Sequence, residues 1–239
     1  MCDSLNFREW HQAKFGMVWK IVVPRNFFIA TCLLAACLWL ISVAQDICFY
    51  GFQCADLQKI IGLLDVEAEV SIYTWYSVCL LFLTGFMAFR HADLVGKGDR
   101  HFRQWVGIGL LFVYLSADES LSIHEKFARI GAMVVEPSGF FRFAWVIPAT
   151  VLVVIVTIAL ISLIADLPKR ERFWAIASGA VFFGGAVGME MVDAKISSMS
   201  SPHTIAYQAV NSLEEAMEVI GVLIFLWVLT SLERKAKAA

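Results

Sequence analysis

The chain has 239 residues, of which 59% are hydrophobic and 17% are charged, and its formal net charge is −2. A soluble globular domain carries about a quarter charged residues, and no basic stretch is dense enough to suggest a nucleic-acid-binding surface. The apolar residues form blocks of about 18 or more, the length that crosses a ~30 Å hydrocarbon core. The sequence therefore predicts an all-α polytopic membrane protein that contacts membrane lipid and no nucleic acid.

Six apolar segments are predicted to cross the membrane as helices of one integral membrane domain over residues 1–239. In chain order, the segments cover residues 27–45, 71–89, 104–125, 143–165, 173–193 and 208–232. Pro148 within the fourth segment is compatible with this prediction, because membrane helices satisfy the freed backbone groups by local adjustment. Segment 46–70 is the longest loop between the predicted spans.

Lys and Arg residues are concentrated in alternate loops, which sets the predicted orientation. The basic segments are residues 1–26, 90–103, 166–172 and 233–239, whereas loop 46–70 is mainly acidic. Basic loops stay on the cytoplasmic side of a membrane. Both termini are therefore predicted to be cytoplasmic, and loop 46–70 is predicted to lie outside.

Two cysteines, Cys48 and Cys54, share this outer loop. On the oxidising side of a membrane such a pair can form a disulfide. Free thiols and a soft metal site are the alternatives that the sequence leaves open.

The third span ends in the stretch "LSADESLSIHEKF", residues 115–127. At 1.5 Å per residue, Asp118 and Glu119 lie about 23 Å above the inner end of this span. A continuous helix places Asp118 and Glu125 on one stripe and turns His124 more than about 90° away from it.

The fifth span carries Glu190 at a similar height. Gly184 and Gly188 lie on the opposite face of the same helix, spaced as in the small-xxx-small pattern of packed membrane helices. This spacing predicts that the glycine face packs on a neighbouring helix while Glu190 points elsewhere.

The sixth span brings Glu214, Glu215 and Glu218 into the outer half of the bilayer, on one arc of the helix. An ionised carboxylate in hydrocarbon costs roughly 3 kcal/mol. Acids from three spans can therefore meet there only if protons or bound cations neutralise them.

A divalent metal ion is the leading interpretation of this convergence. Mixed carboxylate and imidazole ligands suit iron, manganese or zinc. The predicted metal ligands are Asp118, Glu119, His124, Glu190, Glu215 and Glu218. Glu125 and Glu214 are the predicted catalytic acid–base residues, and the predicted activity is an oxidoreductase or hydrolase reaction on a lipid-soluble or periplasmic substrate.

Two other classes of function fit the same residues. A ladder of acids that runs from the outer surface to Glu218 is typical of a proton- or cation-coupled transporter, although the chain shows no inverted repeat. The protein could also be an accessory subunit of a larger membrane complex or a homo-oligomer.

The stretch "YLSADESLSIHEKF", residues 114–127, resembles a group of uncharacterised bacterial multipass membrane proteins. Their helix-end motif is S-x-D-E-x-x-x-I-H-E. The matching residues here are Ser116, Asp118, Glu119, Ile123, His124 and Glu125. The resemblance implies a bacterial inner membrane and brings no activity with it.

Overall fold

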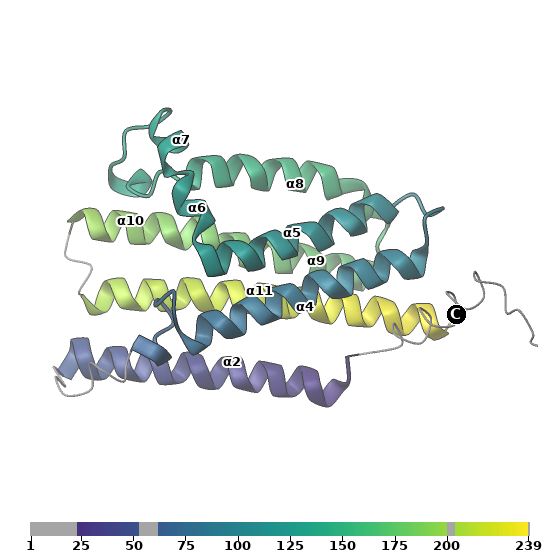
Figure 1. Cartoon of the computed structure of the whole chain (residues 1–239), viewed down its shortest axis with the longest axis horizontal. Helices are drawn as coiled ribbons and strands as arrows, with labels where there is room; N and C mark the ends of the chain where they lie inside the picture. Colours follow the sequence, from purple (N-terminus) through teal and green to yellow (C-terminus); the bar gives the residue numbers. More distant parts are fainter. Residues whose placement is uncertain (1–22, 53–61, 200–203, 239) are drawn as a thin grey trace, which may run out of the picture.

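Long helices that run side by side make up the fold, seen here in a computed structural model (Figure 1). The structure describes residues 23–52, 62–199 and 204–238, and no strand occurs among them. In chain order the elements are α2 (Arg25–Asp46), η1 (Ile47–Gly51), α4 (Ile72–Val95), α5 (Phe102–Leu121), α6 (Ile123–Lys126), α7 (Ala128–Ala132), η3 (Gly139–Phe141), α8 (Val146–Asp166), α9 (Lys169–Phe183), η4 (Gly184–Met189), α10 (Glu190–Met199) and α11 (Ile205–Ala238).

Local sequence explains where several helices begin and end. Pro24 and Pro168 precede α2 and α9, where a proline costs no hydrogen bond because the first N–H groups of a helix have no intrahelical acceptor. Ser71 caps α4, since its hydroxyl accepts a 3.0 Å hydrogen bond from the Thr74 backbone N–H. Gly96 then ends α4 with φ of 81°, a conformation that favours glycine.

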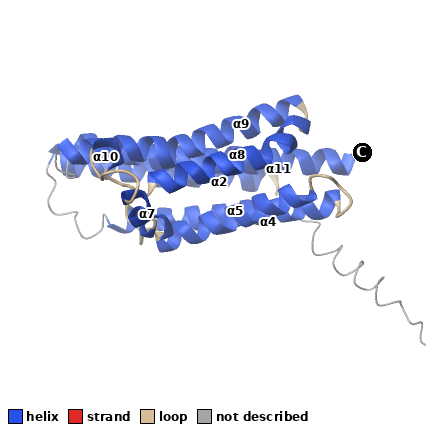
Figure 2. Cartoon of the chain, turned by 90° about the horizontal axis from the view of Figure 1, so that it is seen from above, coloured by secondary structure: helices blue, strands red, loops and turns tan. Residues whose placement is uncertain are grey.

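Helix α11 lies at the centre of the bundle and packs against α2, α4, α9 and α10. Its residues Leu226, Val228 and Leu229 are all 0% exposed. Helices α4 and α5 form a pair on one side of α11 (Figure 2). Helix α8, in contrast, lies largely at the surface, because only 6% of its most apolar 18-residue stretch is buried inside the protein. Its apolar surface is therefore suited to lipid.

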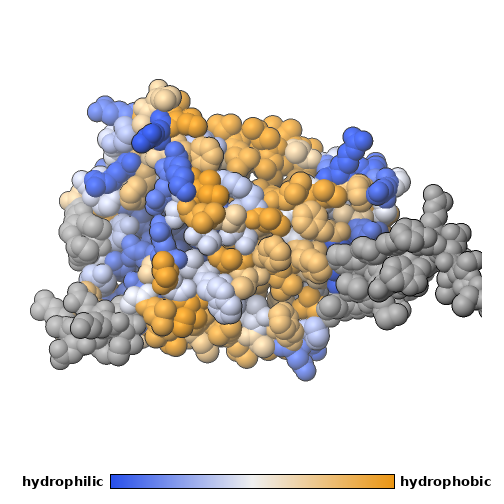
Figure 3. All heavy atoms as spheres, in the orientation of Figure 1, coloured by the Kyte–Doolittle hydropathy of each residue, from blue (hydrophilic) through white to orange (hydrophobic). Residues whose placement is uncertain are grey.

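Among the described residues, five helices are long and apolar enough to cross a membrane, and a sixth is counted if α5 and the bent segment after it form one span. On the face seen in Figure 3, hydrophobic side chains cover the middle and hydrophilic ones gather toward the two ends. Helix α2 begins and α11 ends at the same end of the bundle (Figure 1). The all-helical class predicted from the sequence is confirmed, and the described helices include five or six candidate spans.

The predicted third span, 104–125, is wrong at its C-terminal end. Helix α5 stops at Leu121, and residues 123–132 leave its axis at 80°. Ser122 makes the break with φ of 45° and ψ of 50°, and it is the only non-glycine residue with positive φ in the part of the chain that the structure describes. No proline or glycine marks this position, so the apolar pattern gave no sign of it.

Two ion pairs join the helices at the end of the bundle where α4 stops. Arg90 of α4 lies 3.3 Å from Glu233 of α11, with side chains 1% and 0% exposed. Lys235 of α11 lies 2.7 Å from Glu171 of α9, which also accepts a 2.9 Å hydrogen bond from Ser231. Lys235 is 53% exposed, whereas the side chains of Arg90, Glu233 and Glu171 are at most 1% exposed. Charged groups this deeply buried need their partners, so the pairs fix α11 between α4 and α9.

Candidate functional site

A cavity of about 960 Å³ lies at the opposite end of the bundle, between α5, α6, α8, η4 and α11. All eight residues predicted to be ligands or catalytic groups line it. They are Asp118, Glu119, His124, Glu125, Glu190, Glu214, Glu215 and Glu218. The convergence expected from helical rise alone is thus present, while the roles of the individual residues stay predictions.

The break at Ser122 builds the first part of the site. Beyond the break the chain turns back, so that the His124 backbone N–H donates to Asp118 Oδ1 at 2.7 Å and the His124 ring Nδ1 bonds Asp118 Oδ2 at 3.0 Å. The Ser122 hydroxyl donates to Glu69 Oε1 at 2.7 Å and holds the break from the other side. The expectation that His124 points away from Asp118 is therefore wrong, because it assumed one continuous helix.

The contact with Asp118 also orients the His124 ring. A carboxylate accepts hydrogen bonds, so Nδ1 is the ring nitrogen that the contact with Asp118 engages, and Nε2 takes no part in it. The ring lies 4.4 Å from the Trp145 ring, measured between centroids. Trp145 in turn donates from Nε1 to Glu190 Oε1 at 2.9 Å. A continuous series of side-chain contacts, from Asp118 through His124 and Trp145 to Glu190, therefore connects α5, α6, the start of α8 and α10.

A π-helix, η4, brings Glu190 to the cavity. Its Gly185 touches α11 so closely that an added Cβ would lie 2.9 Å from the Glu214 carbonyl oxygen and 3.3 Å from Glu218 Cγ. The predicted packing face of Gly184 and Gly188 is only half right. Gly184 lies against Met217, whereas nothing lies within 4 Å of a Cβ at Gly188. The extra residue in a π-helical turn rotates the following positions, and the spacing rule for a regular helix does not include this rotation.

Glu214 lies at the most crowded point of the cavity wall. Its side chain lies close to the carboxyl groups of both Glu190 and Asp193. Asp193 is 1% exposed, and no amide, hydroxyl or amine donor among the described residues reaches either of its oxygens. Adjacent buried carboxylates cannot all be ionised without a neutralising charge. A proton or a cation must therefore lie between them.

Glu215, Glu218 and Glu119 form a second acidic group and interact electrostatically with one another. The nearby Tyr73 hydroxyl is already engaged, because it donates to the Glu215 carbonyl oxygen at 3.0 Å. Positive charge is scarce: none of the described arginines or lysines forms an ion pair with these three acids.

Several lining residues were missed by the sequence analysis. Glu67 and Glu69 reach the cavity from the segment before α4, and Arg129 and Arg142 line it from the other side. The acids at positions 65, 67 and 69 were taken only as markers of an outer loop. The segment that carries them is a series of bends, so no regular side-chain spacing marked them as lining residues.

The predicted metal ligands are not assembled around one point. Among residues 23–52, 62–199 and 204–238, no group of three or more His, Cys, Asp or Glu side chains is arranged to hold a metal ion. The metal site therefore stays a prediction. Its six proposed ligands line the same cavity but do not surround one common coordination point.

The structure describes one of the two cysteines of the predicted disulfide. Cys48 lies in η1 and is disulfide-bonded. Cys54 lies outside the described residues, so the pairing of these two cysteines stays a prediction.

The fold and the site together define an all-helical protein with five or six candidate membrane spans and an acidic cavity at one end. The chain belongs to the family described as Domain of unknown function (DUF8692), whose profile matches residues 26–233. No curated protein and no solved structure matches the chain.

Proposed function

We propose that this protein is a metal-dependent enzyme of the bacterial inner membrane. In this proposal six spans leave both termini in the cytoplasm, and the acidic cavity opens to the outside. The location of the start of α2 and the end of α11 at one end of the bundle supports an even number of spans (Figure 1).

One observation carries the metal assignment, the contact between Asp118 and His124. A histidine that donates from Nδ1 to a carboxylate, leaving Nε2 to coordinate, is the usual arrangement around protein-bound metals. The contact of His124 Nδ1 with the Asp118 carboxyl group at 3.0 Å supports this arrangement, and the ring lines a cavity rich in carboxylates. Iron, manganese or zinc suits this mixture of donors. Metal binding would draw the surrounding Glu side chains toward Nε2, because they do not share a centre beforehand.

The walls of the cavity indicate the class of substrate. The acids occupy one side, whereas Leu152 and Val153 of the lipid-facing α8 and Phe182 of α9 contribute apolar surface. A lipid-soluble molecule could enter beside α8 and meet the polar groups within. A bound metal supplies an activated water or an oxidising centre there, and Glu125 or Glu214 is placed to accept a proton.

Proton or cation transport is the second candidate. The contact of Glu214 with Glu190 and Asp193 favours it, because carboxyl groups that share protons form the units of proton relays.

Elemental analysis of protein purified without chelators tests the metal. We expect near-stoichiometric iron, manganese or zinc in the wild type and its loss in both His124→Ala and Glu218→Gln. Glu136→Gln is the matched control, since Glu136 is an exposed acid outside the cavity. A metal-free wild type, or unchanged metal in both cavity variants, would overturn the proposal, and proton flux in liposomes would then test the second candidate.

A further inference from the structure

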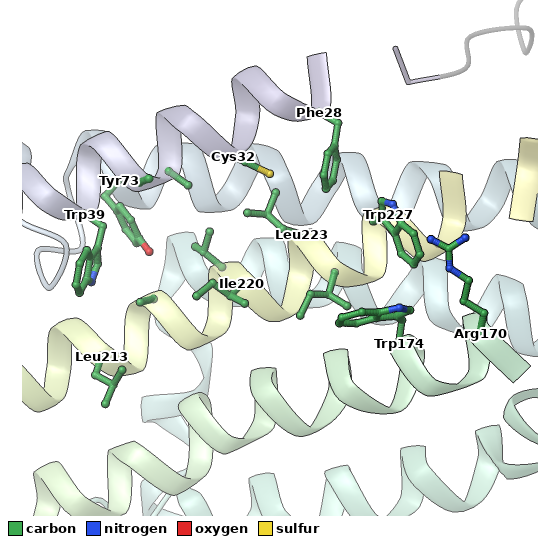
Figure 4. A pocket seen from close by; sticks show the side chains of 15 residues that line it. Phe28, Cys32, Trp39, Tyr73, Arg170, Trp174, Leu213, Ile220, Leu223 and Trp227 are labelled. Atoms are coloured by element: carbon green, nitrogen blue, oxygen red, sulfur yellow. The ribbon is translucent and has the colours of Figure 1, made fainter. Parts of the chain in front are cut away.

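A second cavity, of about 710 Å³, lies between α2, α9 and α11 and is shown in Figure 4. Apolar side chains from all three helices line it, among them Phe28, Ile220 and Leu223. Of the described residues that line it, Arg170 alone carries a charge, and it lies at the end near Trp174 and Trp227 (Figure 4). The cavity is therefore apolar along its length and cationic at one end.

The polar groups of Trp39 and Tyr73, two aromatic residues that line this cavity, already form hydrogen bonds within the protein. Trp39 Nε1 donates to the Ser212 carbonyl oxygen at 2.7 Å, and the Tyr73 hydroxyl donates to the Glu215 carbonyl oxygen at 3.0 Å. Both side chains therefore present apolar ring surface to the cavity, and its occupant need offer them no hydrogen bond.

Arg170 is held in place and still has donors to offer. Its guanidinium carbon lies 4.9 Å from the Trp227 ring centroid, and the Trp174 ring packs edge-on against Trp227 at 5.9 Å. No described residue forms an ion pair with Arg170. Stacking occupies the face of a guanidinium and leaves its N–H edge for a bidentate anion such as phosphate.

We propose that this cavity binds an anionic phospholipid, with the phosphate at Arg170 and an acyl chain along α11. One leaflet is about 15 Å deep, which corresponds to about ten residues of helix and takes the chain from Trp227 to the region of Ala216. Trp residues are typical of the membrane interface, so Trp174 and Trp227 place Arg170 at headgroup level. Lys169 and Arg234 are exposed near this end and add to its attraction for anionic lipid.

Charge complementarity decides between a lipid and a helix as the occupant. A membrane helix could fill the apolar length, but it would need an acidic residue at one defined height to pair with Arg170. An anionic phospholipid supplies the apolar chain and the phosphate in one molecule and at the required separation.

Native mass spectrometry in detergent tests this inference with two probes, phosphatidylglycerol and phosphatidylcholine with the same acyl chains. We expect the wild type to retain phosphatidylglycerol preferentially. Arg170→Ala should lower that retention about fivefold, the equivalent of ~1 kcal/mol per cationic residue near the surface. Arg103→Ala is the charge control, because Arg103 is exposed near the same end and does not line the cavity.

Filling the cavity gives an independent measurement. Ala36→Trp places a large side chain in the cavity and should lower the retention of both lipids, whereas Cys37→Trp, on the adjacent face of α2, should not. Equal losses in Arg170→Ala and Arg103→Ala would show general surface attraction and overturn the proposal. A wild-type dimer that Ala36→Trp dissociates would overturn it as well, since a second copy would then be the occupant. These readouts do not depend on the acidic cavity or its metal.

Discussion

Gly185 provides the sharpest test of how the acidic cavity is built. In Gly185→Ala the new methyl group would lie 2.9 Å from the Glu214 carbonyl oxygen, 3.0 Å from Met217 Cβ and 3.3 Å from Glu218 Cγ. Two of these three atoms belong to the backbone or to a Cβ, so they cannot rotate away. Helices η4 and α11 must separate by several tenths of an ångström at the level of the acids.

The size of the effect follows from this geometry. Overpacking of this kind costs about 1–3 kcal/mol. For a chain of 150–250 residues, each kcal/mol shifts the Tm by about 2–4 °C, so we expect Gly185→Ala to lower the Tm by about 2–12 °C. The separation also moves Glu190 away from Glu214, so metal content should fall with the Tm.

Thermal unfolding in detergent measures the first effect and elemental analysis the second. Gly188→Ala is the matched control: it lies in the same π-helix and a Cβ there meets nothing within 4 Å. Alanine is favoured over glycine in a helix by about 0.5–1 kcal/mol, so this variant should keep or slightly raise the Tm. If the two variants had the same Tm, the close approach of η4 to α11 would be refuted.

Three further expectations concern other contacts. Arg90→Met removes the cation that lies 3.3 Å from the buried Glu233 carboxylate and should lower the Tm by about 6–20 °C, from a cost of about 3–5 kcal/mol. Arg90→Met combined with Glu233→Leu should recover most of the loss. An unimproved double variant would show that the ion pair is not the cause. Asp118→Ala leaves two N–H donors of His124 without acceptors, which should cost about 1–3 kcal/mol and lower the Tm by about 2–12 °C. Asp118→Asn keeps one acceptor oxygen and should therefore lower the Tm less in the same unfolding assay. Chelator treatment should lower the Tm of the wild type by about 5–11 °C if metal is present at 100 times its Kd, and an unchanged Tm would count against a tightly bound metal.

Most of the helices could be predicted from the sequence because their determinants are local. A run of apolar residues long enough to cross the bilayer identifies a span wherever it occurs, and each of the other five predicted spans overlaps an observed helix. The meeting of acids from three spans followed from helical rise and orientation. These steps need no knowledge of which helix packs against which.

Two backbone irregularities decide the details of the site, and neither could be predicted. Ser122 adopts a left-handed conformation that serine seldom takes. The turn is stabilised by the local contact between Asp118 and His124 and by the hydrogen bond from Ser122 to Glu69, a residue that comes close only in the folded chain. The π-helix at residues 184–189 likewise depends on the surface of α11 that it meets. Local patterns describe regular helices and fail where tertiary contacts select an irregular one.

The central place of α11 has a consequence for biogenesis. This helix contributes Glu214, Glu215 and Glu218 to the acidic cavity and also one wall of the apolar one, yet it is the latest of these helices in the chain. During synthesis the earlier spans enter the bilayer while Arg90 and Glu171 still lack their partners on α11. Insertion of α11 then neutralises both charges in one event and forms both cavities. An incompletely synthesised chain would therefore carry Arg90 and Glu171 without these partners on α11, and neither cavity would exist before assembly is complete.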